Sequence, residues 1–296
     1  MDTYPLGDVG LWTGAFESLA RDEVRDTVAE IEELGWPCVW IPETIGRESL
    51  TAATLLLSAT SRITVATGIS SIWARDAVSA AAAHRTITEA FPERFVLGLG
   101  ASHDVLVEGV RGRDYHKPYS AMAAYLAAMG AAPYIAAPPS TPLRQVLAAL
   151  GPKMLKLSAE HADGAHPYLQ PPEHTALARE ILGPDAVLAP EQMVLLNTDA
   201  DEARTIARGL LDGYLGLPNY RNSLLRLGFG EQDLDGGGSD KLIDVLVAHG
   251  GEEDIAAQVQ RHRDAGATHV CVQPLTAGTG FPMREVRALA PALIGA

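Results

Sequence analysis

The chain has 296 residues and a formal net charge of −14, with 47% hydrophobic and 20% charged residues. So negative a charge disfavours nucleic-acid binding, which relies on a clustered basic surface, and no apolar run approaches the roughly 20 residues that a membrane span needs. The length suits either two ordinary domains or one large α/β barrel.

The first residues and the cysteines indicate where the protein works. MDTYPLGDVG contains neither the basic nor the apolar region of a secretory signal, so we expect a cytoplasmic location. The two cysteines, Cys38 and Cys271, both lie in apolar β-branched runs. A thiol in that setting usually behaves as a small buried hydrophobe, so we expect both to be reduced and unpaired.

In the first half of the chain, short apolar runs alternate with helical patterns. We expect strands in DVGLWTG, PCVWIP, ITVATGI and RFVLGLG. The first helix is predicted because Val24, Val28 and Ile31 recur at helical spacing. The helices are expected over about 22–34, 50–59, 76–89 and 119–129, with a polar loop before the last of them.

The second half repeats this plan, with strands expected in RQVLAALG, DGAHPYL, EQMVLLNTD and THVCVQPL. A looser region over 214–251 is expected to be an irregular insertion with short helices. Eight strand-like runs separated by helices predict a parallel sheet and a (β/α)8 TIM barrel, formed as a single domain over 1–296. A doubly wound open sheet is the alternative, but GLWTGAFES lacks its glycine fingerprint.

In a barrel of this kind, function lies at the carboxyl ends of the strands. In RITVATGISSIWARD, Gly68 interrupts a β-branched run; a glycine there either admits a ligand or only turns the chain. Glu43 and His103 are the candidates for acid–base chemistry at strand ends, although a histidine there is often a structural hydrogen-bonding group. Trp12 and Trp73 are expected near the barrel mouth, as pocket walls or as packing.

The stretch LAALGPKMLKLSAEHADG is the sharpest local signal. A strand runs into Gly151, Pro152 suits a first helical turn, and the exposed N–H groups of a helix start would bind an anion beside Lys153. An ordinary junction with a solvated lysine is the alternative. The chain has no Walker GKS or GKT sequence and no HxH or HExxH pair, so neither a Walker loop nor a metal-dependent hydrolase is supported.

Four stretches in this order resemble a known family: LGWPCVWIPE, VATGISSIWARD, RFVLGLGASH and LAALGPKMLKLSAEHADGAHPYL. They resemble the luciferase-like monooxygenase superfamily, in particular its actinobacterial branch of coenzyme F420-dependent oxidoreductases. The resemblance covers nearly the whole chain and implies a (β/α)8 barrel with the cofactor at its mouth. It also implies a cis peptide between Gly68 and Ile69, forming a bulge behind the deazaflavin ring.

The resemblance further implies site residues, some of which depart from the family pattern. Thr44 stands where a related branch has a histidine, which leaves His103, with Glu43, as the catalytic candidates. Trp12, Thr44 and Trp73 are the expected substrate pocket. The expected cofactor contacts are Gly68, Ile69, Ser70, Ala101, Ser102, Leu150, Gly151, Pro152, Lys153 and Met154.

These observations predict an oxidoreductase that transfers a hydride between coenzyme F420 and a small organic substrate. One alternative is an FMN-dependent luciferase-like monooxygenase on the same barrel. A second is a protein that binds a deazaflavin or flavin without catalysis. We expect no metal, no nucleic-acid or membrane partner, and a homodimer.

Overall fold

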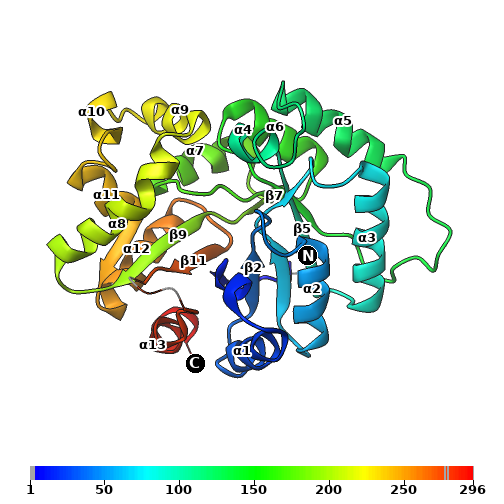
Figure 1. The fold of residues 1–296 in the computed structure, drawn as a ribbon, viewed down its shortest axis with the longest axis horizontal. Coiled ribbons are helices and arrows are strands. Elements are labelled where there is room, and N and C mark those ends of the chain that lie inside the picture. Colours follow the sequence, from blue (N-terminus) through cyan, green and yellow to red (C-terminus); the bar gives the residue numbers. More distant parts are fainter. Residues whose placement is uncertain (1–3, 277, 279, 296) are drawn as a thin grey trace.

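The computed structural model describes residues 4–276, 278 and 280–295. Strands fill the middle of the molecule and helices surround them (Figure 1). The strands are β1 (Val9–Trp12), β2 (Cys38–Ile41), β3 (Thr64–Thr67), β4 (Ser70–Ser71), β5 (Phe95–Gly100), β6 (Gln145–Leu147), β7 (Gly164–Ala165), β8 (Val187–Leu188), β9 (Glu191–Leu196), β10 (Val247–Gly250) and β11 (Val270–Pro274).

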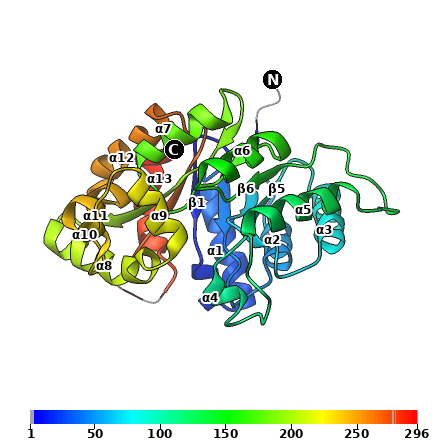
Figure 2. The ribbon, with the colours of Figure 1, turned by 90° about the horizontal axis from the view of Figure 1, so that it is seen from above.

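Among the helices, α2, α3 and α5 lie on one side of the strands and α8 to α11 lie on the opposite side (Figures 1 and 2). The helices are η1 (Ala15–Ser18), α1 (Arg21–Glu33), α2 (Ser49–Ser58), α3 (Ala77–Ala90), α4 (Asp104–Val107), α5 (Pro118–Gly130), α6 (Pro152–His161), α7 (Pro172–Leu182), α8 (Ala200–Leu215), α9 (Pro218–Arg226), α10 (Glu231–Leu234), α11 (Asp240–Leu246), α12 (Glu252–Asp264) and α13 (Met283–Ile294).

The sheet is parallel and curls into a barrel. Its order is β10-β9-β11-β1-β2-β3-β5-β6-β7-β8, with β4 paired to β5. Only Ala189 and Pro190 separate β8 from β9, so the stretch 187–196 acts as one barrel strand. Its start pairs with β7 and its end with β11, which in turn pairs with β1. The predicted (β/α)8 barrel is therefore confirmed, and all eight predicted strand runs take part in it.

The structure adds short elements that the sequence pattern did not predict, among them β10 and α4. β10 lies inside the stretch expected to be irregular and pairs with β9 from Met193 to Leu196. Without β10, the edge of β9 that faces away from β11 would have no strand partner from Met193 to Leu196. The short helix α4 occupies part of the expected polar loop after β5.

The barrel interior is packed with apolar side chains. A cluster that includes Trp12, Cys38, Trp40 and Cys271 fills it, and the last three are fully buried. Both thiols are free, as expected, and burial raises their pKa well above the usual value, which keeps them protonated.

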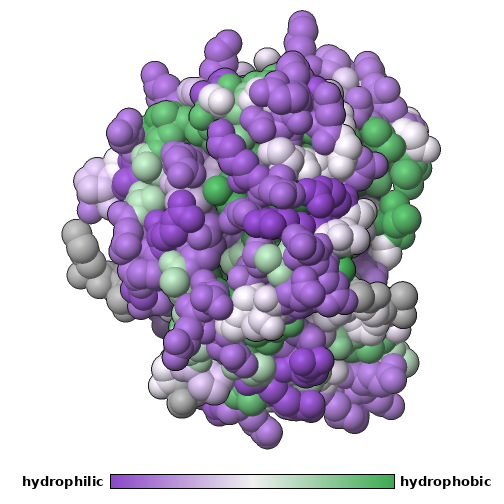
Figure 3. Space-filling model, turned by 90° about the vertical axis from the view of Figure 1, so that its left-hand side faces the viewer, coloured by the Kyte–Doolittle hydropathy of each residue, from purple (hydrophilic) through white to green (hydrophobic). Residues whose placement is uncertain are grey.

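The outer surface is mainly polar. The side of the molecule on which α8, α10 and α11 lie is covered largely by hydrophilic residues, and apolar residues occur there in small separate groups (Figure 3). Among the helices of the described residues, none combines the length and the apolar character needed to cross a bilayer.

Candidate functional site

A cavity of about 750 Å³ opens at the carboxyl ends of the barrel strands. The last residue of β1 and the segments after β2, β3, β5 and β7 form its floor and one side, and the segment after β6 with the start of α6 forms another. The end of α8 and the first helix of the insertion, α9, complete it. The position is the one expected for the functional site of a (β/α)8 barrel.

The bulge after β3 lies at the floor of this cavity. The peptide between Gly68 and Ile69 is cis, as the resemblance implied. Its two neighbouring carbonyl oxygens are both held: that of Gly68 accepts from Trp12 Nε1 at 3.1 Å, and that of Ile69 accepts from the Glu43 N–H at 3.2 Å. The bulge is thus fixed by the ends of β1 and β2.

The glycines of RFVLGLG make room for this bulge. A Cβ on Gly100 would collide with the end of the Ile69 side chain, and a Cβ on Gly98 would collide with the Thr67 carbonyl oxygen. Ile69 therefore lies against the backbone of β5 and forms part of the cavity wall. A glycine at position 100 is therefore explained by the packing of Ile69, and a contact with a ligand is not needed to explain it.

Glu43 lines the cavity, but its carboxylate is engaged on all sides. It accepts hydrogen bonds from the N–H groups of Ser71 at 2.7 Å and Ser49 at 3.2 Å, and it forms an ion pair with Arg75. Arg75 also pairs with Glu48. Glu43, which was expected to act in acid–base chemistry, therefore links the segment after the bulge to the start of α2 through these hydrogen bonds.

His103 stands at the N-terminal cap of α4 and lines the same cavity. Its ring lies 5.4 Å from that of Tyr220. Burial lowers the pKa of His103, and a hydrogen bond with the Asn219 side chain opposes this shift. His103 is therefore mainly neutral at pH 7, the form that accepts a proton.

Most of the other predicted site residues also line the cavity: Trp12, Thr44, Gly68, Ile69, Ala101, Ser102, Leu150, Gly151 and Met154. Four do not. The Ser70 side chain is buried behind the bulge, where its Oγ lies 2.6 Å from Ser49 Oγ. Trp73 lies outside the lining and donates from Nε1 to the Ala101 carbonyl oxygen at 2.8 Å. Pro152 and Lys153 are exposed on the first turn of α6.

Sequence reasoning missed a cationic residue beside the start of α6. Arg226, at the end of α9, lines the cavity, and its Nη2 lies 3.8 Å from where a Cβ on Gly151 would be. Arg226 therefore lies in the cavity wall beside the helix N-terminus that was expected to bind an anion, whereas Lys153 is exposed and does not line the cavity. The segment YRNSLLRLGF contains Arg226, but no local pattern in it indicates which strand end it reaches.

Sequence reasoning also missed an aromatic wall and a buried histidine. Tyr168 after β7, Tyr214 on α8 and Tyr220 on α9 line the cavity together with Trp12. His166, also after β7, lines its floor and is only 1% exposed. The sequence HPYL directly after β7 contains His166 and Tyr168, and it was the local pattern that could have indicated them.

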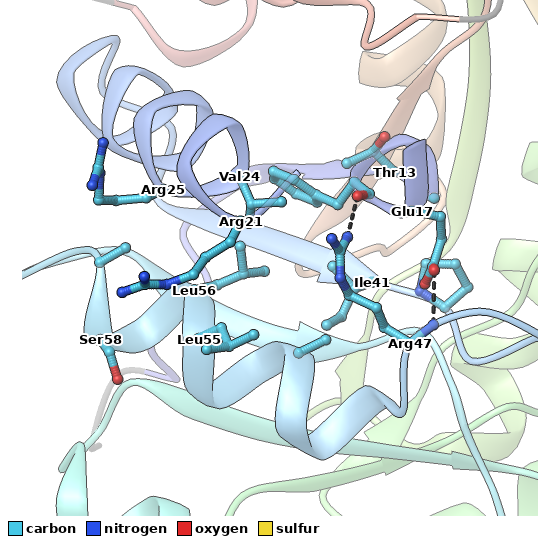
Figure 4. Close-up of a pocket in the computed structure, with 15 residues that line it drawn as sticks. Thr13, Glu17, Arg21, Val24, Arg25, Ile41, Arg47, Leu55, Leu56 and Ser58 are labelled. Atoms are coloured by element: carbon cyan, nitrogen blue, oxygen red, sulfur yellow. Dashed lines mark hydrogen bonds between the residues drawn. The ribbon is translucent and has the colours of Figure 1, made fainter. Parts of the chain in front are cut away.

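A second cavity, of about 330 Å³, lies between α1 and α2 (Figure 4). Its walls are mostly apolar, with Arg47 and Glu17 at one end and Arg25 and Ser58 at the other. The guanidinium of Arg47 donates to the carbonyl oxygens of Phe16 and Leu19, so it already has partners. We therefore take the larger cavity at the strand ends as the candidate site.

The donor groups around the larger cavity suit an organic ligand. Among the described residues, no group of three or more His, Cys, Asp or Glu side chains is placed to hold a metal ion. An elongated molecule with an anionic group would find N–H donors and Arg226 near Gly151, and a flat apolar surface at Ile69 and the tyrosines.

Comparisons with known proteins agree with this architecture. A family model described as luciferase-like monooxygenase matches residues 7–269. A Mycobacterium tuberculosis protein, whose name assigns it provisionally to the coenzyme F420-dependent oxidoreductases, is 27% identical over 204 residues. That match spans 59% of this chain and 59% of the relative.

Two solved structures share the fold at low sequence identity. An F420-dependent secondary alcohol dehydrogenase in complex with an F420-acetone adduct superposes with a TM-score of 0.78 at 13% identity, covering 97% of this chain and 98% of the other. The oxygenating constituent of 3,6-diketocamphane monooxygenase from Pseudomonas putida, in complex with FMN, gives 0.71 at 10% identity and covers 96% of both chains. At these identities the likeness shows the fold alone.

Proposed function

Because the chain belongs to the luciferase-like monooxygenase family, we propose that it is an oxidoreductase that transfers a hydride between coenzyme F420 and a small organic substrate. The provisional name of the Mycobacterium tuberculosis relative supports the choice of cofactor. The observation that carries the proposal is the arrangement of the large cavity, where the Ile69 bulge and the N-terminus of α6 at Gly151, with Arg226 beside it, line one space.

The residues present fit a deazaflavin. Ile69 and the backbone of the bulge would support one face of its ring, because Trp12 and Glu43 hold that backbone in place. The N-terminus of α6 at Gly151, with Arg226, would hold its phosphate. When bound, the deazaflavin supplies or accepts a hydride at C5 of its ring.

His103 is the proposed proton carrier. It borders the cavity, and its neutral form accepts a proton from the oxygen or nitrogen of the substrate as a hydride leaves the adjacent carbon; in the reverse direction it returns that proton. Glu43 is proposed to act as a positioning residue, because both of its carboxylate oxygens already have partners in Ser71, Ser49 and Arg75.

Cofactor titration tests the proposal. Coenzyme F420 fluorescence and FMN fluorescence are measured while the purified protein is added, and we expect tighter binding of F420. Arg226→Gln should weaken F420 binding about tenfold, since one charge-assisted contact is lost. Arg221→Gln is the matched control, because Arg221 lies on the same helix but pairs with Glu231 and Asp235 outside the cavity.

An FMN-dependent monooxygenase is the alternative function. It is favoured by the likeness to a fold that holds FMN and by the same anion-binding end, which serves either cofactor. Tighter binding of FMN, together with turnover that consumes NADH and oxygen, would establish this alternative in place of the deazaflavin reaction.

A binding protein without catalysis is the remaining alternative, and His103→Ala separates it from an enzyme. The catalytic proposal expects the variant to bind F420 as the wild type does and to lose turnover. If a broad screen of alcohols, aldehydes and imines leaves the F420 absorbance unchanged with the wild type, binding alone is the function.

We further propose that the protein works in the cytoplasm and that, as the family resemblance implies, it forms a homodimer. Sedimentation equilibrium of the purified chain tests the association. A mass equal to that of one chain, 31.4 kDa, would contradict the dimer.

A further inference from the structure

A row of aromatic rings forms one wall of the large cavity. Trp12 and Tyr168 have ring centroids 5.1 Å apart, and Tyr168 and Tyr220 are separated by 6.2 Å. Tyr220 is followed by His103 at 5.4 Å, and Tyr214 packs on both tyrosines. Such a wall presents faces and edges on which another flat ring stacks favourably.

His166 lies at the other end of this row and has an unused acceptor. Its Nδ1 is 2.7 Å from the Ala189 carbonyl oxygen, so Nδ1 must carry the proton and donate it. Its Nε2 therefore bears a lone pair, and no described residue donates to it. Burial lowers the pKa of His166 to about 4, so the ring stays neutral.

The unused nitrogen faces the floor of the cavity beside the bulge. A Cβ on Gly68 would lie 3.0 Å from His166 Nε2 and 2.6 Å from Trp12 Nε1, so His166 and Trp12 pack directly against Gly68 and only a glycine fits beside them. A buried acceptor without a donor is unfavourable, and a bound donor would remove that penalty. The corner is therefore built to receive an O–H or N–H group.

The charges around the cavity indicate a neutral ligand at this end. Among the described lining residues, the side chains with a permanent charge are Glu43 and Arg226. Glu43 is neutralised by Arg75, and Arg226 stands at the Gly151 end, where the proposed function places the phosphate of the cofactor. A charged substrate would find no partner at the floor.

Resting on the proposed function, we infer that the substrate is a small neutral aromatic molecule with a hydroxyl or amino donor remote from its reacting group. The ring stacks on the row formed by Trp12, Tyr168 and Tyr220. The remote donor gives its hydrogen bond to His166 Nε2, and the reacting group points along the row towards His103. His166 is thus a specificity residue.

Three probes test this inference with F420-loaded protein. We expect para-hydroxybenzyl alcohol to bind about tenfold more tightly than para-methoxybenzyl alcohol, which keeps the ring and lacks the remote donor. It should also bind more tightly than its cyclohexane counterpart, which keeps both hydroxyls and lacks the aromatic ring. Calorimetry gives the dissociation constants, and nitrogen NMR should show a shift of His166 Nε2 only with probes that contain the donor.

Two matched variants assign the effect to one nitrogen. In the wild type the His166 ring stacks on that of Trp40, with centroids 4.5 Å apart, and His166→Phe keeps a ring at this place. The variant should abolish the preference for the hydroxyl over the methoxy probe. His269→Phe is the control: His269 is equally buried against Trp40, but both of its nitrogens have partners and it lies outside the cavity lining. It should keep the preference.

Equal affinities of the wild type for the hydroxyl and methoxy probes, or a preference that persists in His166→Phe, would overturn the inference. If His166→Phe does not fold, the wild-type NMR shift decides the matter alone, and an unmoved Nε2 signal overturns the inference. Tight F420 binding without discrimination among the probes leaves the proposed function standing. Absent F420 binding contradicts that function, and the probes are then compared on the protein alone.

Discussion

The indole Nε1 of Trp12 donates a hydrogen bond of 3.1 Å to the carbonyl oxygen of Gly68. This bond ties the end of β1 to the bulge after β3, across an intervening strand. The Trp12 side chain is 7% exposed, so water competes little for the bond. The shape of the cavity floor therefore depends on a side chain that also belongs to its aromatic wall.

Trp12→Phe should lower the free energy of unfolding by about 1–2 kcal/mol, because the Gly68 carbonyl oxygen is left without a donor. It should also weaken cofactor binding, since the bulge is less well held. Trp73→Phe is the comparison: it removes a similar bond, to the Ala101 carbonyl oxygen, from a residue outside the cavity lining. Urea unfolding and F420 titration distinguish them, and an equal loss of affinity in both variants would contradict the role given to Trp12.

Gly100→Ala should displace Ile69 from the backbone of β5, because a Cβ at this position collides with the end of the Ile69 side chain. We expect a destabilisation of about 1–3 kcal/mol and weaker F420 binding. Gly209→Ala on α8 is the control, since a Cβ there meets nothing within 4 Å and a helical alanine is favoured by about 1 kcal/mol. If Gly100→Ala binds F420 as the wild type does, Ile69 does not shape the site.

Arg75→Met should destabilise the protein by about 3 kcal/mol, because it leaves the buried Glu43 carboxylate without its cation. In the double variant, Glu43→Gln with Arg75→Met, part of that loss should be recovered because the unpaired charge is gone. A double-mutant cycle from thermal unfolding measures the coupling. Strictly additive effects would show that the pair is not coupled.

Glu191→Gln should change how stability depends on pH. Glu191 is fully buried, and burial raises its pKa from 4.5 to about 8 in the folded protein. Between these values the unfolded chain has released the proton while the folded protein keeps it, so stability decreases as pH rises through this range. The glutamine has no proton to release, so Glu191→Gln should gain stability relative to the wild type between pH 5 and pH 8. The unfolding free energies of the variant and the wild type at pH 5 and at pH 8 check this. A difference between the two proteins that is the same at both pH values contradicts it.

The barrel was predictable because each strand and helix has its own local pattern. The apolar β-branched runs predicted where β1, β2, β3 and β5 lie, and their ends predicted where Trp12, Glu43 and His103 would meet. Side-chain direction was harder to predict. The bulge after β3 changes the alternation of the strand, so Ser70 turns away from the cavity while Ile69 lines it.

The contributions of the insertion were not predictable from local pattern. Tyr214, Tyr220 and Arg226 reach the cavity because α8 and α9 pack over the barrel mouth, an arrangement set by long-range contacts of their apolar faces. The sequence predicted short helices in this region and gave no direction for their polar or aromatic side chains. The same limit explains why Lys153 was preferred to Arg226 as the anion partner.

The separation of these contributions along the chain has a consequence for redesign. The bulge and the start of α6 come from barrel segments before residue 162, whereas Tyr214, Tyr220 and Arg226 all lie within 200–226. The covering helices are therefore contiguous in the chain, but their buried apolar side chains belong to one core cluster with β9, β10 and α11. A redesign of the cavity through this stretch must therefore keep its buried apolar positions and change only the side chains that line the cavity, such as Tyr214 and Tyr220.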